Sequence, residues 1–126
     1  MLLRQSSNAA IQAGELGHFL AAEHVERIDI PSRLDRDQGD VHASGNPHVF
    51  WNPYKLLTIA RKLSERLIQL EPEHRVYFEG QLKAFEDDWQ NKILEWEDQA
   101  AHLKGSQFII HHKSCCLLYT SPSPRD

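Results

Sequence analysis

Two long helical patterns occupy the second half of the chain, and a proline separates them. From Pro53 to Leu70 apolar residues recur at spacings of four and three, which predicts a helix with one buried face. Residues 71–73 (EPE) interrupt this pattern, because a proline lacks the N–H group that a helix interior needs. A second pattern then runs from about Glu73 to Leu103. The chain is therefore expected to fold around two helices that meet at a sharp break.

The second helix is long for a chain of this size. About 30 residues at 1.5 Å each give roughly 45 Å, so we interpret it as a helix that spans two lobes. The alternative is a coiled-coil or bundle helix. Large aromatic residues and the strand predicted to follow favour packing onto a globular body. The apolar stripe of this helix consists of Phe78, Leu82, Phe85, Trp89, Ile93, Trp96, Ala100 and Leu103.

Shorter elements are expected before these helices. Residues 8–14 are predicted to form a loop or short strand, and residues 15–25 a helix. Residues 27–31 (RIDIP) indicate a short strand that a proline closes. Residues 32–47 form a long loop, and loops of this length are usually functional or disordered.

A second strand is expected after the long helix. Gly105 ends the helix, as glycine commonly does. Residues 107–111 (QFIIH) are a short apolar run, typical of a buried parallel strand. His112 follows at the carboxyl end, where ligands gather in open α/β sheets. These patterns predict the α/β class.

Composition excludes several classes of protein. The 126 residues have a formal charge of −4, with 25% charged and 40% hydrophobic residues, which suits about one domain. Lys and Arg do not cluster, so no nucleic-acid partner is expected. No apolar run approaches the roughly 20 residues of a membrane span, and the apolar start is too short for a signal peptide. The adjacent Cys115 and Cys116 are neither a disulfide pair nor a spaced metal pair.

One histidine is placed between two Asn-Pro pairs, in the sequence NPHVFWNP of residues 46–53. The first proline stiffens the approach to His48, because it restricts both itself and the preceding residue. Asn52 is a good N-cap and Pro53 suits the first helical position. His48 is therefore expected on a short, rigid segment held by a helix start.

His48 and His112 are the candidate metal ligands. Neutral imidazole binds zinc, and also manganese and iron, but zinc takes four ligands. The alternative for each residue is a histidine that is simply hydrogen-bonded in a loop. His111 alternates with His112 across the strand, so only one of them faces a given site. Asp40 is expected to orient a ligand, with a surface position as the alternative, and His42 is held as a reserve ligand.

Other chemistries have less support. Ser114 lies two residues from His112, but no nucleophile-elbow pattern surrounds it. No glycine-rich phosphate loop is present in the sequence. The acidic residues of the long helix are predicted to face solvent, and they are Glu86, Asp87, Asp88, Glu95, Glu97 and Asp98.

The last eleven residues have neither helical nor strand periodicity. The sequence CLLYTSPSPRD of residues 116–126 resembles the in-frame translation of a transposase-type sequencing adapter. We therefore expect residues 116–126 to be a non-native tail, and the alternative is a natural disordered end. The source DNA tests this, since different codons there would contradict the hypothesis.

Taken together, these motifs resemble the metal-binding substrate-binding proteins of ABC-type importers for zinc, manganese and iron. Residues 46–53 look like the Asn/Asp-Pro-His-x-x-x-Asp-Pro segment of that family, with Asn52 where an Asp is usual. Residues 108–114 (FIIHHKS) look like the apolar strand that ends in a second histidine ligand, which makes His112 the ligand. Residues 39–45 (GDVHASG) match a loop common in one branch of the family.

The resemblance implies a fragment of a two-lobed, periplasmic-binding-protein-like fold. It assigns residues 1–72 to the C-terminal part of the first lobe, 73–104 to the lobe-connecting helix and 105–115 to the first strand of the second lobe. The family's first histidine ligand, its fourth, acidic ligand and the export signal are expected outside this chain. We therefore expect the chain alone to fold poorly, and to bind zinc no better than a loose two-histidine site.

The implied function is capture of a divalent metal ion, zinc first, with manganese or iron as alternatives. The ion would pass to an ABC importer permease in the membrane. Such a protein is not an enzyme, and the intact parent would be periplasmic or lipid-anchored. Two other interpretations stay open: a metal-dependent hydrolase that uses His48 and His112 with an acidic base, and a helical interaction module in which the histidines are incidental.

Overall fold

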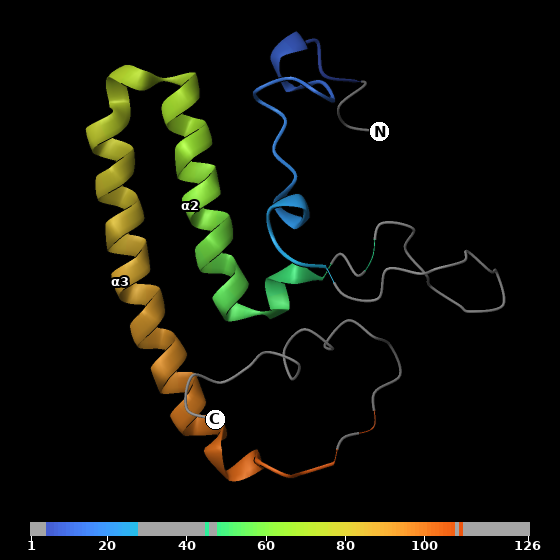
Figure 1. Cartoon of the computed structure of the whole chain (residues 1–126), viewed down its shortest axis with the longest axis vertical. Coiled ribbons are helices and arrows are strands. Elements are labelled where there is room, and N and C mark those ends of the chain that lie inside the picture. The colour runs from blue at the N-terminus through green and yellow to red at the C-terminus, as the bar shows by residue number, and fades with distance from the viewer. Residues whose placement is uncertain (1–4, 28–44, 46–47, 108, 110–126) are drawn as a thin grey trace, which may run out of the picture.

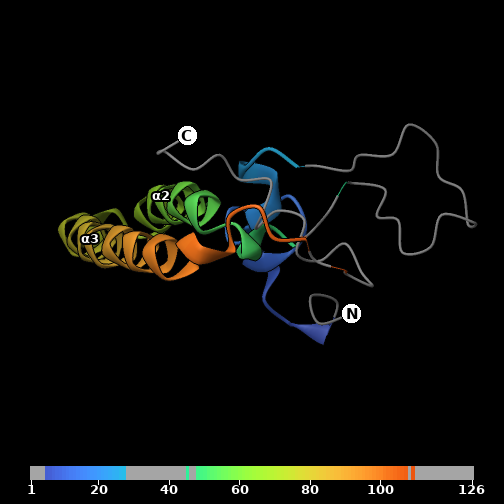
Figure 2. The same cartoon turned by 90° about the horizontal axis from the view of Figure 1, so that it is seen from below.

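The computed structural model describes residues 5–27, 45, 48–107 and 109, and its main feature is a helical hairpin. Helix α2 (Pro53–Leu70) and helix α3 (Arg75–Ala100) run antiparallel side by side, joined by the 3₁₀ turn η5 (Pro72–His74) (Figure 1). A segment with two short 3₁₀ turns, η1 (Ala9–Ile11) and η2 (Ala21–His24), precedes the hairpin. It lies beside α2, on the side away from α3, as both views show (Figures 1 and 2).

Helix α2 begins and ends where the sequence predicts. The Asn52 side chain accepts hydrogen bonds from the backbone N–H groups of Tyr54 and Lys55, at 3.1 and 3.0 Å. Pro53 occupies the first helical position, where its missing N–H costs nothing. At the other end the N–H of Glu71 donates to the Leu67 carbonyl at 2.9 Å, and Pro72 prevents a further turn.

Helix α3 confirms the long helix predicted after the break, and the 3₁₀ turn η6 (Ala101–Leu103) continues it. Gly105 then adopts a positive φ of 82°, a conformation that costs glycine little. Along the helix Phe85 stacks on Trp89 with ring centroids 5.4 Å apart, and Trp96 meets Trp89 edge-on at 5.2 Å. Of the predicted stripe, Ile93 is buried, whereas Trp96 and Leu103 remain partly exposed.

The helix predicted for residues 15–25 is wrong, since only Ala21–His24 form a turn of 3₁₀ helix there. The chain instead turns at Gly17, whose N–H donates to the Ala10 carbonyl at 3.0 Å. This close approach of two backbones needs a residue without a Cβ. Leu16 and Leu20, which a helix would have buried on one face, are about half exposed.

The hydrophobic core lies where the N-terminal segment meets the start of α2. Val49 and Ile59 are buried at its centre. Val49 directly follows His48, and Ile59 lies in α2. The core therefore links the residues next to His48 with helix α2. The half-buried residues around them are Phe19, Ala21, Ala22, Val25 and Leu56.

The described residues contain no β-strand, so the α/β class is not confirmed by this part of the chain. Arg27, Gln107 and Ile109 belong to the two predicted strands, and none of the three is in a strand. The other residues of these strands lie outside the described residues, as does most of the predicted loop 32–47. Among the described helices, none is both long and apolar enough to cross a membrane.

Candidate metal centre

His48 lies shortly before α2, as the sequence predicts. It is the N-cap of the 3₁₀ turn η4 (Val49–Trp51), with φ −79° and ψ 39°. Its carbonyl accepts a hydrogen bond from the N–H of Trp51 at 3.1 Å. The side chain is half-buried, and its ring meets that of Phe50 edge-on with centroids 5.8 Å apart.

The residues that follow His48 are held firmly. Val49 is only 5% exposed and belongs to the core with Ile59. Asn52 is 3% exposed, and besides capping α2 its own N–H donates to the Val49 carbonyl at 3.2 Å. Turn η4 therefore joins helix α2 through a buried cap, which fixes the path of the backbone from Val49 to Pro53.

His112, the second candidate ligand, lies outside the described residues, together with Asp40, His42 and His111. The predicted convergence of His48 and His112 therefore stays a prediction. Among the residues that the structure does describe, no three histidine, cysteine or carboxylate side chains gather as a metal site would require. One described histidine is structural: His24 stacks on Phe19 with ring centroids 4.5 Å apart.

Two acidic residues of α3 pair with lysines of the same helix. Asp87 pairs with Lys83 at 2.9 Å and Glu95 with Lys92 at 2.8 Å, and both carboxylates are exposed as predicted. A hydrogen bond to Asp87, and its charge, raise the pKa of Lys83, and Glu95 raises the pKa of Lys92 in the same way.

The prediction that every acidic residue of α3 faces solvent is wrong for Glu86 and Glu97. Both are half-buried, and both pair with groups of α2: Glu86 with Arg61 at 2.5 Å, and Glu97 with the hydroxyl of Tyr54. The helical pattern used apolar residues alone to predict the face of α3 that contacts α2. It therefore missed Glu86 and Glu97, which lie beside that face.

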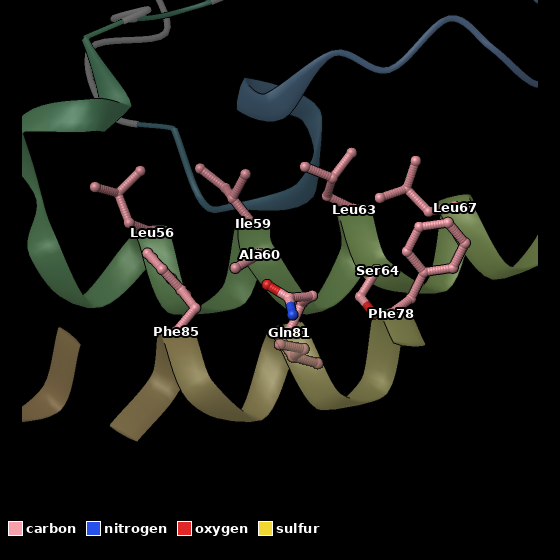
Figure 3. Close-up of a pocket in the computed structure, with 10 residues that line it drawn as sticks. Leu56, Ile59, Ala60, Leu63, Ser64, Leu67, Phe78, Gln81 and Phe85 are labelled. Carbon is pink, nitrogen blue, oxygen red and sulfur yellow. The ribbon is translucent and has the colours of Figure 1, made fainter. Parts of the chain in front are cut away.

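A groove of about 340 Å³ opens along the hairpin and is unsuited to a metal ion (Figure 3). None of the residues that line it is a histidine, a cysteine or an acidic residue. Leu63 and Leu67 point away from α3 in the close-up, and the Ser64 side chain lies between the two helices. The lining residues are Leu56, Ile59, Ala60, Leu63, Ser64, Leu67, Phe78, Gln81, Leu82 and Phe85.

A comparison with known families gives one match. The model of the family described as zinc-uptake complex component A, periplasmic (ZnuA) matches residues 3–119, which is nearly the whole chain. Searches of curated proteins and of solved structures gave no significant match. The family match covers both of the motifs that carry the resemblance, residues 46–53 and 108–114.

Proposed function

The chain belongs to the ZnuA family of periplasmic zinc-uptake components, and we propose that it captures zinc outside the cytoplasm for delivery to the permease of an ABC importer. The family is one of metal-binding substrate-binding proteins in transport, and the resemblance drawn from the sequence motifs is thereby confirmed. The match over residues 3–119 is the observation that carries the proposal. The proposal also includes zinc as the preferred ion and the permease as the partner.

His48 and His112 are the proposed ligands. The position of His48 supports this role, because contacts that orient a ligand strengthen metal binding. Its half-buried ring stands at the start of turn η4, and the buried residue Asn52 holds the other end of that turn. Imidazole nitrogens suit zinc, whereas a shell richer in carboxylates would favour manganese. Manganese and iron remain the competing ions to test.

The proposed activity needs no catalytic residue, because the ion leaves the protein in the form in which it was bound. We propose that residues 1–72 belong to a first lobe, 73–104 to a connecting helix and 105–115 to the start of a second lobe. The long helix α3 and its extension η6 support this division. In this arrangement the protein acts in the periplasm or from a lipid anchor on the outer face of a membrane.

Zinc titration of the full chain tests the proposal. Zinc affinity is measured by competition with a chromophoric chelator for the unchanged chain, for His48→Ala and for His112→Ala. Each substitution is expected to weaken binding at least about tenfold, because even residues that only support a ligand have effects of that size. His102→Ala is the matched control, since His102 is exposed on η6.

The result that contradicts the proposal is equally specific. If His48→Ala and His112→Ala both bind zinc as the unchanged chain does, these histidines are not the ligands. Tighter binding of manganese than of zinc at equal concentration would instead leave the ligands in place and change the cargo. Repeating the titration with Mn²⁺ distinguishes the two results.

A further inference from the structure

Helix α3 is bonded to the first turn of α2, next to His48. The indole Nε1–H of Trp89 donates to the carbonyl oxygen of Pro53 at 2.9 Å, although the two residues lie 36 positions apart. The Trp89 ring is half-buried and is fixed in turn by Phe85 and Trp96 on either side. An indole N–H is a donor only, so this bond has a defined direction.

A second bond joins the same two helices one residue further along α2. The hydroxyl of Tyr54 donates to a carboxylate oxygen of Glu97, and both side chains are half-buried. Glu97 lies about two turns beyond Trp89 on α3. A bond to an ionised acceptor is stronger than one between neutral groups. Two bonds from points this far apart fix both the position and the direction of the α2 start.

Three backbone and side-chain contacts connect Pro53 back to His48. Asn52 caps α2 and bonds the Val49 carbonyl, and the N–H of Trp51 bonds the His48 carbonyl. The Val49 side chain sits in the core. A shift of α3 relative to the α2 start would therefore move the His48 backbone rather than be absorbed between them.

We propose that Trp89 and Glu97 are positioning residues for His48, so that α3 sets where this imidazole presents its nitrogen to a divalent metal ion. This inference rests on the proposed function, in which His48 is a ligand. Neither residue touches the metal; both act through the backbone of residues 48–54. Its consequence is that zinc affinity depends on hydrogen bonds far from the metal in sequence.

The test uses the full chain, with zinc as the probe, and follows the His48 ring resonances by NMR during titration. Tyr54→Phe removes one hydroxyl, and Trp89→Phe removes the indole N–H while keeping an aromatic ring. Each is expected to weaken zinc binding roughly tenfold and to change the shift of the zinc-bound His48 ring. Glu97→Gln retains an acceptor oxygen but loses the negative charge, so it is expected to weaken zinc binding less than Tyr54→Phe does.

The matched control is Tyr77→Phe, which removes a hydroxyl from an exposed tyrosine on helix α3. Helix content by circular dichroism is recorded for every variant, because a merely structural effect would lower it. If Trp89→Phe loses helix content, Tyr54→Phe alone gives the answer, since it removes a single oxygen atom.

The outcomes separate this inference from the proposed function. A His48 ring that does not respond to zinc in the unchanged chain overturns both. A ring that responds, with Tyr54→Phe and Trp89→Phe binding zinc as the unchanged chain does, overturns the inference alone. Weaker binding in both variants at unchanged helix content, with a smaller loss for Glu97→Gln, supports it.

Discussion

The hairpin of residues 53–103 and the segment of residues 5–27 are built in different ways. The hairpin follows rules that act within a few residues: a cap at Asn52, a break at Pro72 and a positive-φ glycine at position 105. The N-terminal segment takes its path from residues far along the chain. Arg66 donates to the carbonyl of Leu16 at 2.8 Å and Lys55 to that of Glu26.

This difference explains where each region draws its stability. A helix with a cap and a regular apolar face is favoured before any partner arrives, although packing adds most of its stability. Short 3₁₀ turns such as η1 and η2 have poorer hydrogen bonds and persist only on a support. The support here is α2, through the core around Val49 and Ile59. Substitutions should therefore act differently in the two regions.

The largest effect is expected where the regions meet, at Ile59→Ala. Ile59 is 8% exposed and packs in the core with the N-terminal segment. Loss of a buried isoleucine side chain typically costs about 2–5 kcal/mol of unfolding free energy. Urea unfolding followed by circular dichroism measures it. The neighbouring Thr58→Ala, at an exposed position, serves as the control, and equal midpoints for the two variants would show that this core contributes nothing.

Gly17→Ala should disturb the N-terminal segment and spare the hairpin. A Cβ at this position would lie 2.5 Å from the Ala10 carbonyl oxygen, so the two backbones must separate. Overpacking of this kind costs about 1–3 kcal/mol. In this variant, amide hydrogen exchange is expected to accelerate at position 17 and at His18, while the amides of α3 keep their protection. Unchanged exchange throughout would show that the turn yields without cost.

Asn52→Ala tests the local rule at the start of the hairpin. The change removes the acceptor for two backbone N–H groups, and loss of such a cap costs about 1 kcal/mol. Asn52→Asp keeps an acceptor oxygen at the helix N-terminus but buries a charge, so its urea midpoint should fall between those of Asn52→Ala and the unchanged chain. If both variants unfold at the same urea concentration, the cap does not stabilise α2.

Gly80→Ala should give a small effect of opposite sign to Gly17→Ala. Gly80 lies inside α3 with an exposed Cα, and a Cβ there would meet no described atom within 4 Å. Alanine is favoured over glycine in a helix interior by roughly 0.5–1 kcal/mol. Thermal unfolding should therefore occur at a higher temperature. A lower unfolding temperature would indicate that this face of α3 is covered by another part of the chain.

The sequence predicted the hairpin well because its signals are local. The spacing of Leu56, Ala60, Leu63, Leu67 and Leu70 gave the helix, and Pro72 gave the break. The spacing did not give the buried face, because the buried residues of α2 are Leu57, Ile59 and Ser64. The same periodicity gave a wrong helix at residues 15–25, where the turn at Gly17 depends on the Ala10 carbonyl and on Arg66, which bonds the Leu16 carbonyl from α2. A pattern read over eleven residues cannot register a contact that forms only on folding.

The candidate metal centre divides in the same way. The capped, rigid setting of His48 follows from residues 46–53 and agrees with the observed turn η4. The family match supports the motif that contains His112, but the pairing of the two histidines stays a prediction. The bonds from Trp89 and Glu97 could not be predicted, since a tryptophan in an apolar stripe gives no sign of which carbonyl its N–H will meet.

By itself the sequence determined the two helices, the break between them and the placement of His48 just before a capped helix start, because caps, prolines and apolar spacing act over a few residues. Only the tertiary structure decided that residues 15–20 turn back instead of forming a helix, and that Glu97 accepts a hydrogen bond from Tyr54 rather than from water. Those outcomes depend on groups brought together from distant parts of the chain. Their energies exist only once the helices have packed.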